Sequence, residues 1–524
     1  MQTKKILSAF LAAAVIGASA AAPQVPMTVS AQNPIIQTGF TPDPAPVVFG
    51  DELWVFTGRD NDGNNSNYTM TGWQCFSTKD MQNWTDHGCF LEDDDFEWCN
   101  ANDAWASQCI ERNGKYYFYF TTTNKGGGGR AIGVGVADKP EGPYTDVLKK
   151  PLCGPNWDYI DPTVIIDDDG QAWLMFGNPK CYYVKLNEDM TSLGGQIQNF
   201  NLSLPSGTRY GEGPWIYKHD SLYYLVFASF VDGFGGESIS YCTGPSVTGP
   251  WTFRGNIHEG SNCFTTHGGI IDYKGHSYSF YHMNGLPGGG TFNRSAACEE
   301  FTYGFDGSIP ALKSTRTGPQ QIELLNPYQR VEAETMSWSS GIKTEKIEAG
   351  TLAIGFIENG DYTKISGVDF GENGASQFTA SVSSNGSGGN IELHLDSTTG
   401  PVVGKATVPV TGGWQEWETV TCDVAGASGT HDLYLVFSGG DSYLFNVDYW
   451  EFTEIGGASV LPGDVNGDEI INAVDLSLAK RVGSGLLTDS AAKKAADVNK
   501  DGSVNKSDYE WYMQYLTVQT TDLP

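Results

Sequence analysis

The stretch Gly114-Lys-Tyr-Tyr-Phe-Tyr-Phe120 places a turn residue before a run of aromatic side chains. Similar stretches begin at Gly50, Gly170, Asp220 and Gly275, so the pattern recurs every 50 to 64 residues. Aromatic runs between turn residues are typical of β-strands, and repeats of this length are typical of propeller blades with about four strands each. The five repeats predict a mainly β chain that begins with a five-bladed β-propeller.

A polar residue precedes four of the five runs at a similar distance. Asp43, Asp161, Glu212 and His267 lie seven to nine residues before their runs. Equivalent positions of successive blades surround one axis, so we expect these side chains to converge on the central depression if they belong to the innermost strands. In the second blade Asp103 lies farther from its run, and we leave it outside this set.

Glu212 stands between glycines in Tyr210-Gly-Glu-Gly-Pro-Trp215. In a narrow apolar pocket such a carboxyl group loses hydration, its pKa rises, and it becomes a general acid. Two carboxyl groups with separated pKa values are what glycoside hydrolysis requires, because one protonates the leaving oxygen while the other activates water. The alternative is that Asp43 and Asp161 only form turns, since each precedes a proline. Their shared spacing favours the catalytic interpretation.

Residues 32–316 resemble glycoside hydrolase family 43, whose members are inverting, exo-acting arabinofuranosidases and xylosidases on a five-bladed propeller. The matching stretches are Thr41-Pro-Asp-Pro-Ala-Pro46, Ala104-Trp-Ala106, Ile160-Asp-Pro-Thr163, Glu212-Gly-Pro-Trp215, Thr266-His-Gly268 and Asn293-Arg-Ser295. The resemblance implies that Asp43 is the general base and Glu212 the general acid. It implies that Asp161 orients the acid and tunes its pKa.

The same resemblance implies roles for further residues. His267 would lie near the propeller axis, where family members often hold a metal ion or water, and Arg294 would contact the sugar. Trp105 and Trp215 are our candidates for stacking on the sugar ring. The structural alternatives are a hydrogen-bonded core histidine, a surface ion pair for Arg294, and tryptophans that belong to the core.

The composition limits the possible partners and the location of the protein. The net charge of −31 over 524 residues argues against nucleic acid and anionic membranes, and leaves neutral polysaccharide as a partner. Lys4 and Lys5 precede the apolar run Ile6–Ile16 and small-residue cleavage sites, so residues 1–31 are predicted to be a secretory signal peptide. No later segment is apolar enough to span a bilayer, so we expect a secreted, extracellular protein without membrane insertion.

Export also permits disulfide bonds. The candidates among the ten cysteines are Cys75, Cys89, Cys99 and Cys109.

Residues 328–454 alternate between polar and apolar side chains with Gly and Ser turns, which predicts a β-sandwich. They resemble carbohydrate-binding module family 6 in Val331-Glu-Ala-Glu334, Ile357-Glu-Asn-Gly-Asp-Tyr362, Gly413-Trp-Gln415 and Asn446-Val-Asp448. Two aromatic faces and an amide suit a sugar site, so Tyr362, Trp414 and Asn446 are candidates. The resemblance further implies a structural calcium held by Glu332, Glu334 and Asp448.

A linker, residues 455–463, precedes two loops that begin 33 residues apart in residues 464–520. Each loop places oxygen ligands at the positions of an EF-hand calcium site, where the seventh residue offers its carbonyl. The ligands are Asp464, Asn466, Asp468, Ile470, Asn472 and Asp475, then Asp497, Asn499, Asp501, Ser503, Asn505 and Asp508. We predict one helix after each loop, from Leu476 and from Tyr509. This form resembles a type I dockerin, which implies a cohesin partner; a calcium sensor would need paired helices around each loop.

Together these features predict a secreted exo-glycosidase that removes α-L-arabinofuranosyl or β-D-xylosyl units from arabinoxylan-type hemicellulose. A binding module would hold it on polysaccharide, and a dockerin would join it to a cellulosome-like complex. Two alternatives stay open: an endo-acting arabinanase, and a noncatalytic polysaccharide-binding propeller.

Overall fold

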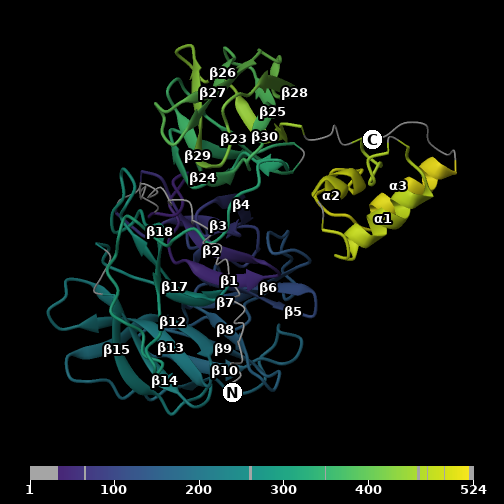
Figure 1. Ribbon diagram of the computed structural model, residues 1–524. Coiled ribbons are helices and arrows are strands. Elements are labelled where there is room, and N and C mark those ends of the chain that lie inside the picture. Colours follow the sequence, from purple (N-terminus) through teal and green to yellow (C-terminus); the bar gives the residue numbers. More distant parts are fainter. Residues whose placement is uncertain are drawn as a thin grey trace, which may run out of the picture.

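The computed structural model describes residues 33–63, 66–258, 262–348, 350–456, 461–468, 470–488 and 490–517. The predicted signal peptide and the middle of the linker lie outside these residues. Figure 1 shows a large β body, a smaller β body beside it and a small helical part near the C-terminus. In the described ranges no helix has the length and apolarity needed to cross a membrane.

The first part is a propeller of five antiparallel sheets, each continuous in sequence apart from one added strand. The first blade contains β1 (Ala45–Phe49), β2 (Glu52–Asp60), β3 (Met70–Thr78) and β4 (Trp84–Glu92), and the second contains β5 (Trp105–Arg112), β6 (Lys115–Thr123) and β7 (Arg130–Ala137). The third contains β8 (Thr163–Ile166), β9 (Ala172–Phe176), β10 (Tyr182–Lys185) and β11 (Gln198–Asn199), and the fourth contains β12 (Thr208–His219), β13 (Leu222–Val231), β14 (Glu237–Gly244) and β15 (Thr252–His258). The fifth contains β16 (Gly269–Tyr273), β17 (His276–Met283) and β18 (Ser295–Phe301).

The first strands of the five blades form a closed ring. β1 contacts β5, β5 contacts β8, β8 contacts β12, β12 contacts β16, and β16 returns to β1. The five aromatic repeats are the second strands β2, β6, β9, β13 and β17, whose side chains fill the space between neighbouring blades. The predicted five-bladed propeller is therefore confirmed. The residues before each repeat lie in or near the innermost strands.

The candidate disulfides are wrong. Cys75, Cys89, Cys99 and Cys109 are free thiols, and three of them are buried in the blades. Cys109 lies within hydrogen-bonding distance of the Tyr144 hydroxyl, 3.2 Å away, and burial raises the pKa of its thiol to about 12. These cysteines act as small apolar core residues.

The second part is a sandwich of two antiparallel sheets, as predicted. One sheet has the order β22-β23-β30-β25-β28, with β19 also paired to β30, and the other has the order β21-β24-β29-β26-β27. The strands are β19 (Val331–Glu332), β20 (Thr335–Met336), β21 (Trp338–Ser340), β22 (Lys343–Lys346), β23 (Leu352–Gly355), β24 (Tyr362–Asp369), β25 (Ala375–Ser384), β26 (Gly389–Leu395), β27 (Val402–Val408), β28 (Gly413–Asp423), β29 (Thr430–Gly439) and β30 (Asn446–Glu454).

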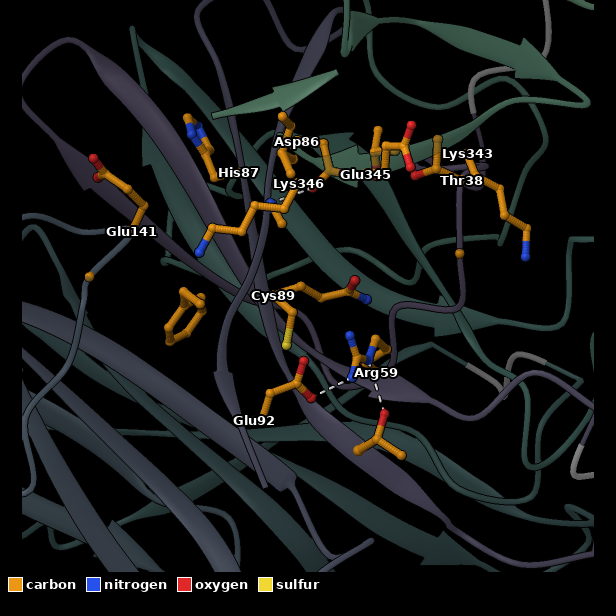
Figure 2. A pocket seen from close by; sticks show the side chains of 18 of the residues that line it. Thr38, Arg59, Asp86, His87, Cys89, Glu92, Glu141, Lys343, Glu345 and Lys346 are labelled. Carbon is orange, nitrogen blue, oxygen red and sulfur yellow. Dashed lines mark hydrogen bonds and ion pairs between the residues drawn. The ribbon is translucent and has the colours of Figure 1, made fainter. Parts of the chain in front are cut away.

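The short strand β20 joins the two β bodies, because it pairs with β4 and becomes the fifth strand of the first blade. Nearby, Asn83 of the propeller donates to the carbonyl oxygen of Ser366 and accepts the backbone N–H of the same residue. A cavity of about 880 Å³ also lies between the bodies. Figure 2 shows its walls, where Arg59 is paired with Glu92 and hydrogen-bonded to Thr71.

The third part contains α1 (Ala473–Gly483), α2 (Ser490–Ala496) and α3 (Lys506–Leu516). α1 and α3 each begin three residues earlier than predicted. Asn472 and Asn505 are their N-caps, and Asp475 and Asp508 complete a capping box at each start. The helices therefore overlap the ends of the calcium loops. The sequence analysis missed α2, which has only seven residues.

Candidate active site

Asp43 lies two residues before β1 in a strained backbone conformation, with φ of 56°. Non-glycine residues rarely adopt positive φ, and such strain is concentrated at functional sites. Its backbone N–H points at Nδ1 of His282, 3.3 Å away, while Nε2 of His282 lies 2.9 Å from the Thr265 carbonyl oxygen. Because a carbonyl can only accept, His282 carries its proton on Nε2.

The charge of Asp43 is stabilised by Arg294. Burial alone raises the pKa of Asp43, but the Arg294 guanidinium, 3.0 Å from Oδ1, outweighs it and holds the pKa well below its usual range. Asp60 fixes Arg294 from the other side through Nε and Nη2, at 3.0 and 2.9 Å. Asp43 is thus a buried carboxylate that stays ionised, as a general base requires.

Asp161 lies two residues before β8 and also has positive φ, 60°. Its Oδ2 accepts the backbone N–H of Gly213, 3.0 Å away, so it is tied to the residue next to Glu212. Burial, followed by the charges of Glu212 and Asp43, raises the pKa of Asp161 well above its usual value. Its position suits the predicted role of orienting the acid.

Glu212 lies in β12, where the pairing with β13 is irregular on both sides of it. Such bulges redirect a side chain out of the regular strand alternation. Asn178 donates to its Oε2 at 2.6 Å, which leaves Oε1 to carry a proton. Burial raises the pKa of Glu212, and the nearby charge of Asp43 adds to this effect. A Glu212 with a raised pKa in the same pocket as an ionised Asp43 is the pair that acid–base hydrolysis needs.

The three predicted acids line one pocket of about 260 Å³. Aromatic side chains form much of its wall, namely Tyr68, Trp105, Phe230 and Phe264, and Arg294 also lines it. The structure therefore brings together side chains from residues 43 to 294 of the chain. This pocket is the candidate active site, whereas the larger cavity of Figure 2 lies between the propeller and the sandwich.

The two candidate tryptophans differ. Trp105 lines the pocket, and the Arg130 guanidinium lies 5.0 Å from its ring centre. Trp215 is a wrong prediction, because it is 3% exposed and packs in the core between blades. Its indole N–H donates to the Ile270 carbonyl oxygen at 3.0 Å. The irregular pairing between Glu212 and Trp215 lets the Glu212 side chain face the pocket while Trp215 faces the core.

His267 is buried beside Gly213, where a Cβ would lie 3.1 Å from Nδ1 of the histidine. Burial lowers the pKa of His267 to about 4, so it is neutral. Among the described residues, the only group of three or more acidic, His or Cys side chains close enough to share a metal ion is Asp497, Asp501 and Asp508. Metal binding by His267 stays a prediction.

The polar residues of the site that the sequence analysis missed include Asp60, Asn178 and Glu237. Asp60 ends β2, Asn178 follows β9 and Glu237 begins β14, so none occupies the repeated position before a blade. Glu237 is 3% exposed and lines the pocket with Glu212. The spacing that identified the other acids gives no signal for these residues.

In the sandwich, Trp414 and Asn446 come together but Tyr362 does not. Ser383 of β25 pairs with Asn446, and its hydroxyl donates to the carbonyl oxygen of Trp414 at 2.8 Å. Tyr362 belongs to the other sheet, beside Tyr434, so its assignment to this sugar site is wrong.

An aromatic residue that the sequence analysis missed lies near Asn446 instead. Phe356 is 42% exposed and follows Gly355, where a Cβ would lie 2.9 Å from Oδ1 of Asn446. Phe356 and Trp414 are thus the better pair of candidate sugar platforms.

The predicted calcium ligands of the sandwich partly fit a cation. Oε2 of Glu334 is buried without a hydrogen-bond partner, which fits an oxygen that binds a cation. Oδ1 of Asp448 also lacks a hydrogen bond, but the Arg330 guanidinium lies 3.6 Å from it. Burial raises the pKa of Glu334 well above its usual value. Glu332 is instead paired with Arg330, at 2.7 and 2.8 Å. Glu334 and Asp448 would hold the ion, which would supply positive charge between them.

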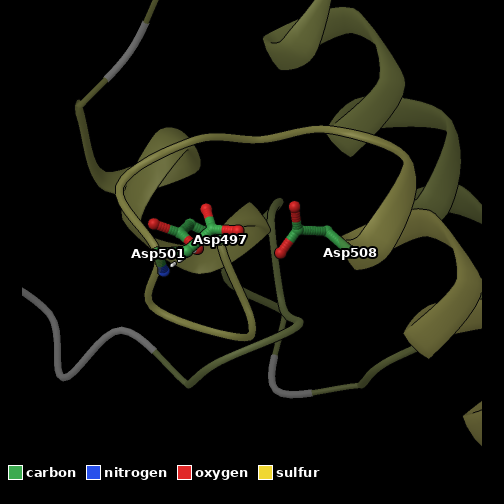
Figure 3. A group of neighbouring side chains, drawn as sticks. All are labelled: Asp497, Asp501 and Asp508. Carbon is green, nitrogen blue, oxygen red and sulfur yellow. Dashed lines mark hydrogen bonds between the residues drawn. The ribbon is translucent and has the colours of Figure 1, made fainter. Parts of the chain in front are cut away.

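The second calcium loop has the geometry of a metal site. Figure 3 shows Asp497, Asp501 and Asp508 facing one another, and their ligand oxygens lie within 4.8 Å of each other. Gly502, the sixth residue of the loop, has φ of 83°, which only glycine adopts without strain. An oxygen-only set of this kind suits calcium.

The first loop is similar: Asp475 accepts the backbone N–H groups of Val465 and Asn472, as Asp508 accepts those of Val498 and Asn505.

Comparisons with known proteins agree with this division. The family model of glycosyl hydrolases family 43 matches residues 31–309, that of carbohydrate binding module (family 6) matches 332–454, and that of the dockerin type I domain matches 462–517. An arabinoxylan arabinofuranohydrolase of Bacillus subtilis is 33% identical over 486 residues, which cover 80% of this chain and 92% of that protein. One of Paenibacillus polymyxa is 32% identical over 490 residues, covering 82% and 75%.

The fold agrees with a solved structure as well. The crystal structure of a family 43 arabinoxylan arabinofuranohydrolase from Bacillus subtilis, in complex with cellotetraose, has a TM-score of 0.72 and 32% identity. The match covers 81% of this chain and 98% of that one, so it includes both the propeller and the sandwich.

Proposed function

The chain belongs to glycosyl hydrolases family 43, and we propose that it removes single α-L-arabinofuranosyl or β-D-xylosyl units from arabinoxylan-type hemicellulose with inversion of configuration. Its family and relatives make it a glycoside hydrolase that acts on hemicellulose. The small pocket, about 260 Å³, favours a single terminal unit over a long internal segment of polymer. We therefore favour exo action over the endo-acting alternative.

The observation that carries this proposal is the opposite pKa shift of two carboxyl groups in one pocket. Glu212 would donate its Oε1 proton to the leaving oxygen as the glycosidic bond breaks. Asp43 would take a proton from water as that water attacks the anomeric carbon from the other face of the sugar. Asp161 would keep the Glu212 strand in register through Gly213. Phe230, Phe264 and Trp105 would exclude water from the remaining walls.

The test compares the p-nitrophenyl α-L-arabinofuranoside, the p-nitrophenyl β-D-xyloside and arabinoxylan. The wild type should release p-nitrophenol from at least one of the two aryl glycosides. Glu212→Ala should lose more activity on arabinoxylan than on that aryl glycoside. The reason is that p-nitrophenol leaves without needing a proton, whereas a sugar oxygen needs one. An equal loss on both substrates would contradict the role of Glu212 as the acid. Release of oligosaccharides from arabinoxylan, in place of a monosaccharide, would contradict exo action.

We further propose that the sandwich holds the enzyme on polysaccharide and that the dockerin attaches it to a cohesin of an extracellular complex. Both attachments would raise the local concentration of enzyme at its polymer without adding contacts in the active site. Trp414→Ala should weaken retention on insoluble arabinoxylan while hydrolysis of the aryl glycoside stays unchanged. Binding to a cohesin should require calcium and disappear with a chelator.

A further inference from the structure

Glu237 is a buried acid that the proposed mechanism does not use. It is the first residue of β14, opposite Phe230 of β13, and it lines the same pocket as Glu212. Its side chain comes from the third strand of the blade, whereas Asp43, Asp161 and Glu212 come from the first strands or just before them. A glutamate that is only 3% exposed at such a place needs a hydrogen-bonding role for each carboxyl oxygen.

One of its oxygens has a structural role. The backbone N–H of Glu237 donates to the Phe264 carbonyl oxygen at 2.9 Å, and Oε2 accepts the backbone N–H of Thr266 at 3.1 Å. These two bonds tie Glu237 to the segment that carries Phe264 and Thr265, both of which line the pocket. They also fix the direction of the side chain.

The other oxygen has no such role. Oε1 lies over Gly211, where a Cβ would be only 2.9 Å away, so the absence of a side chain at residue 211 makes room for it beside Glu212. Among the described residues no group donates a hydrogen bond to Oε1. Oε1 is also not fully buried, so a molecule in the pocket can reach it. Oε1 is thus a fixed polar atom at the pocket surface.

We propose that Glu237 is a fourth carboxyl group of the active site, which hydrogen-bonds a hydroxyl group of the sugar in the pocket through Oε1. Burial raises the pKa of Glu237 to about 8, so the carboxyl group is neutral under mildly acidic conditions and can donate as well as accept. A neutral carboxyl group adds no repulsion to a pocket that already holds three acids.

This contact predicts a change in KM rather than in kcat. The hydroxyl is held both in the bound substrate and in the transition state, and uniform binding of this kind lowers KM without raising kcat. Glu237→Ala should raise KM for the aryl glycoside roughly fivefold to tenfold, with kcat within about threefold of wild type, because one hydrogen bond is lost. In Glu237→Gln, the amide oxygen can accept from Thr266 and the amide nitrogen can donate to the sugar. It should keep KM within about threefold of wild type.

The experiment measures kcat, KM and Tm of the full-length wild type, Glu237→Ala, Glu237→Gln and Glu299→Ala on the aryl glycoside that the wild type cleaves. Glu299 is a matched control, since it is also a buried glutamate but bonds to Asn33, Tyr281 and Thr315 outside the pocket. Its loss should lower Tm and leave KM unchanged.

A wild-type KM in Glu237→Ala would overturn the inference, as would a KM defect in Glu237→Gln equal to that of the alanine variant. If Glu237→Ala does not fold, Glu237→Asp replaces it, and its shorter side chain should raise KM at least fivefold. The inference rests on the proposed function, but the two fail separately: an inactive wild type contradicts the function, and an unchanged KM contradicts only the role of Glu237.

Discussion

At the scale of single residues, one cation, Arg294, determines that Asp43 stays ionised. Arg294 holds the pKa of Asp43 below its usual range, so the acidic limb of kcat/KM against pH should lie far below neutrality. Arg294→Lys keeps a charge but loses the fork that Asp60 and Asp43 share. The pKa of Asp43 should then rise, and the acidic limb should move up by roughly one pH unit. Arg254→Lys, at an exposed pair with Asp306, is the control; identical limbs in all three proteins would contradict this account.

Glu237 also predicts a dependence of stability on pH. Its pKa is raised in the folded protein, to about 8, so between the ordinary value of 4.5 and 8 the folded state binds more protons than the unfolded state. The free energy of unfolding therefore falls as pH rises through this window. Glu237→Gln removes this loss, so its Tm relative to wild type should increase between pH 5 and pH 8, by roughly 2–4 °C for each kcal/mol recovered. A Tm difference that is the same at both pH values would contradict a buried, titrating Glu237.

At the scale of elements, local sequence patterns predicted the features that recur in every blade. They missed the features that depend on the pairing of strands far apart in the sequence. The second strands of the blades and the residues before the first strands recur in sequence, so five blades and three acids could be predicted. Whether Trp215 faces the pocket depends on a bulge in β12, and whether Tyr362 joins Trp414 depends on which sheet each strand enters. Neither fact has a local signal. Glu237 was missed because β14 carries no repeated motif.

The calcium loops give an element-scale prediction. Asp508 is both a candidate ligand and the capping-box residue of α3, so calcium binding and helix formation share one side chain. Asp508→Ala should lower the calcium stoichiometry by one ion in titration calorimetry and weaken the start of α3, because the capping box loses the side chain that accepts the Asn505 backbone N–H. Glu510→Ala, on the same helix and paired with Lys506, should keep the full stoichiometry. Equal stoichiometry in both variants would show that the second loop does not bind calcium.

At the scale of the whole molecule, the propeller depends on the sandwich for a strand. β20 covers the edge of β4, Met336 lies opposite the buried Trp84, and Asn83 forms its paired hydrogen bonds with Ser366. A fragment of residues 32–327 lacks all of these partners and leaves β4 as an open edge, which favours aggregation.

That fragment should therefore unfold several degrees below the full chain in calorimetry, since a buried polar group that loses its partner costs roughly 1–3 kcal/mol. A fragment of residues 32–456 is the matched control, because it lacks only the helical part and should keep the Tm of the propeller. Equal Tm values for the two fragments would mean that the blade is complete without β20. A lower Tm for the shorter fragment would mean that the binding module also serves as part of the catalytic fold, which explains why the two are joined by a strand rather than by a free linker.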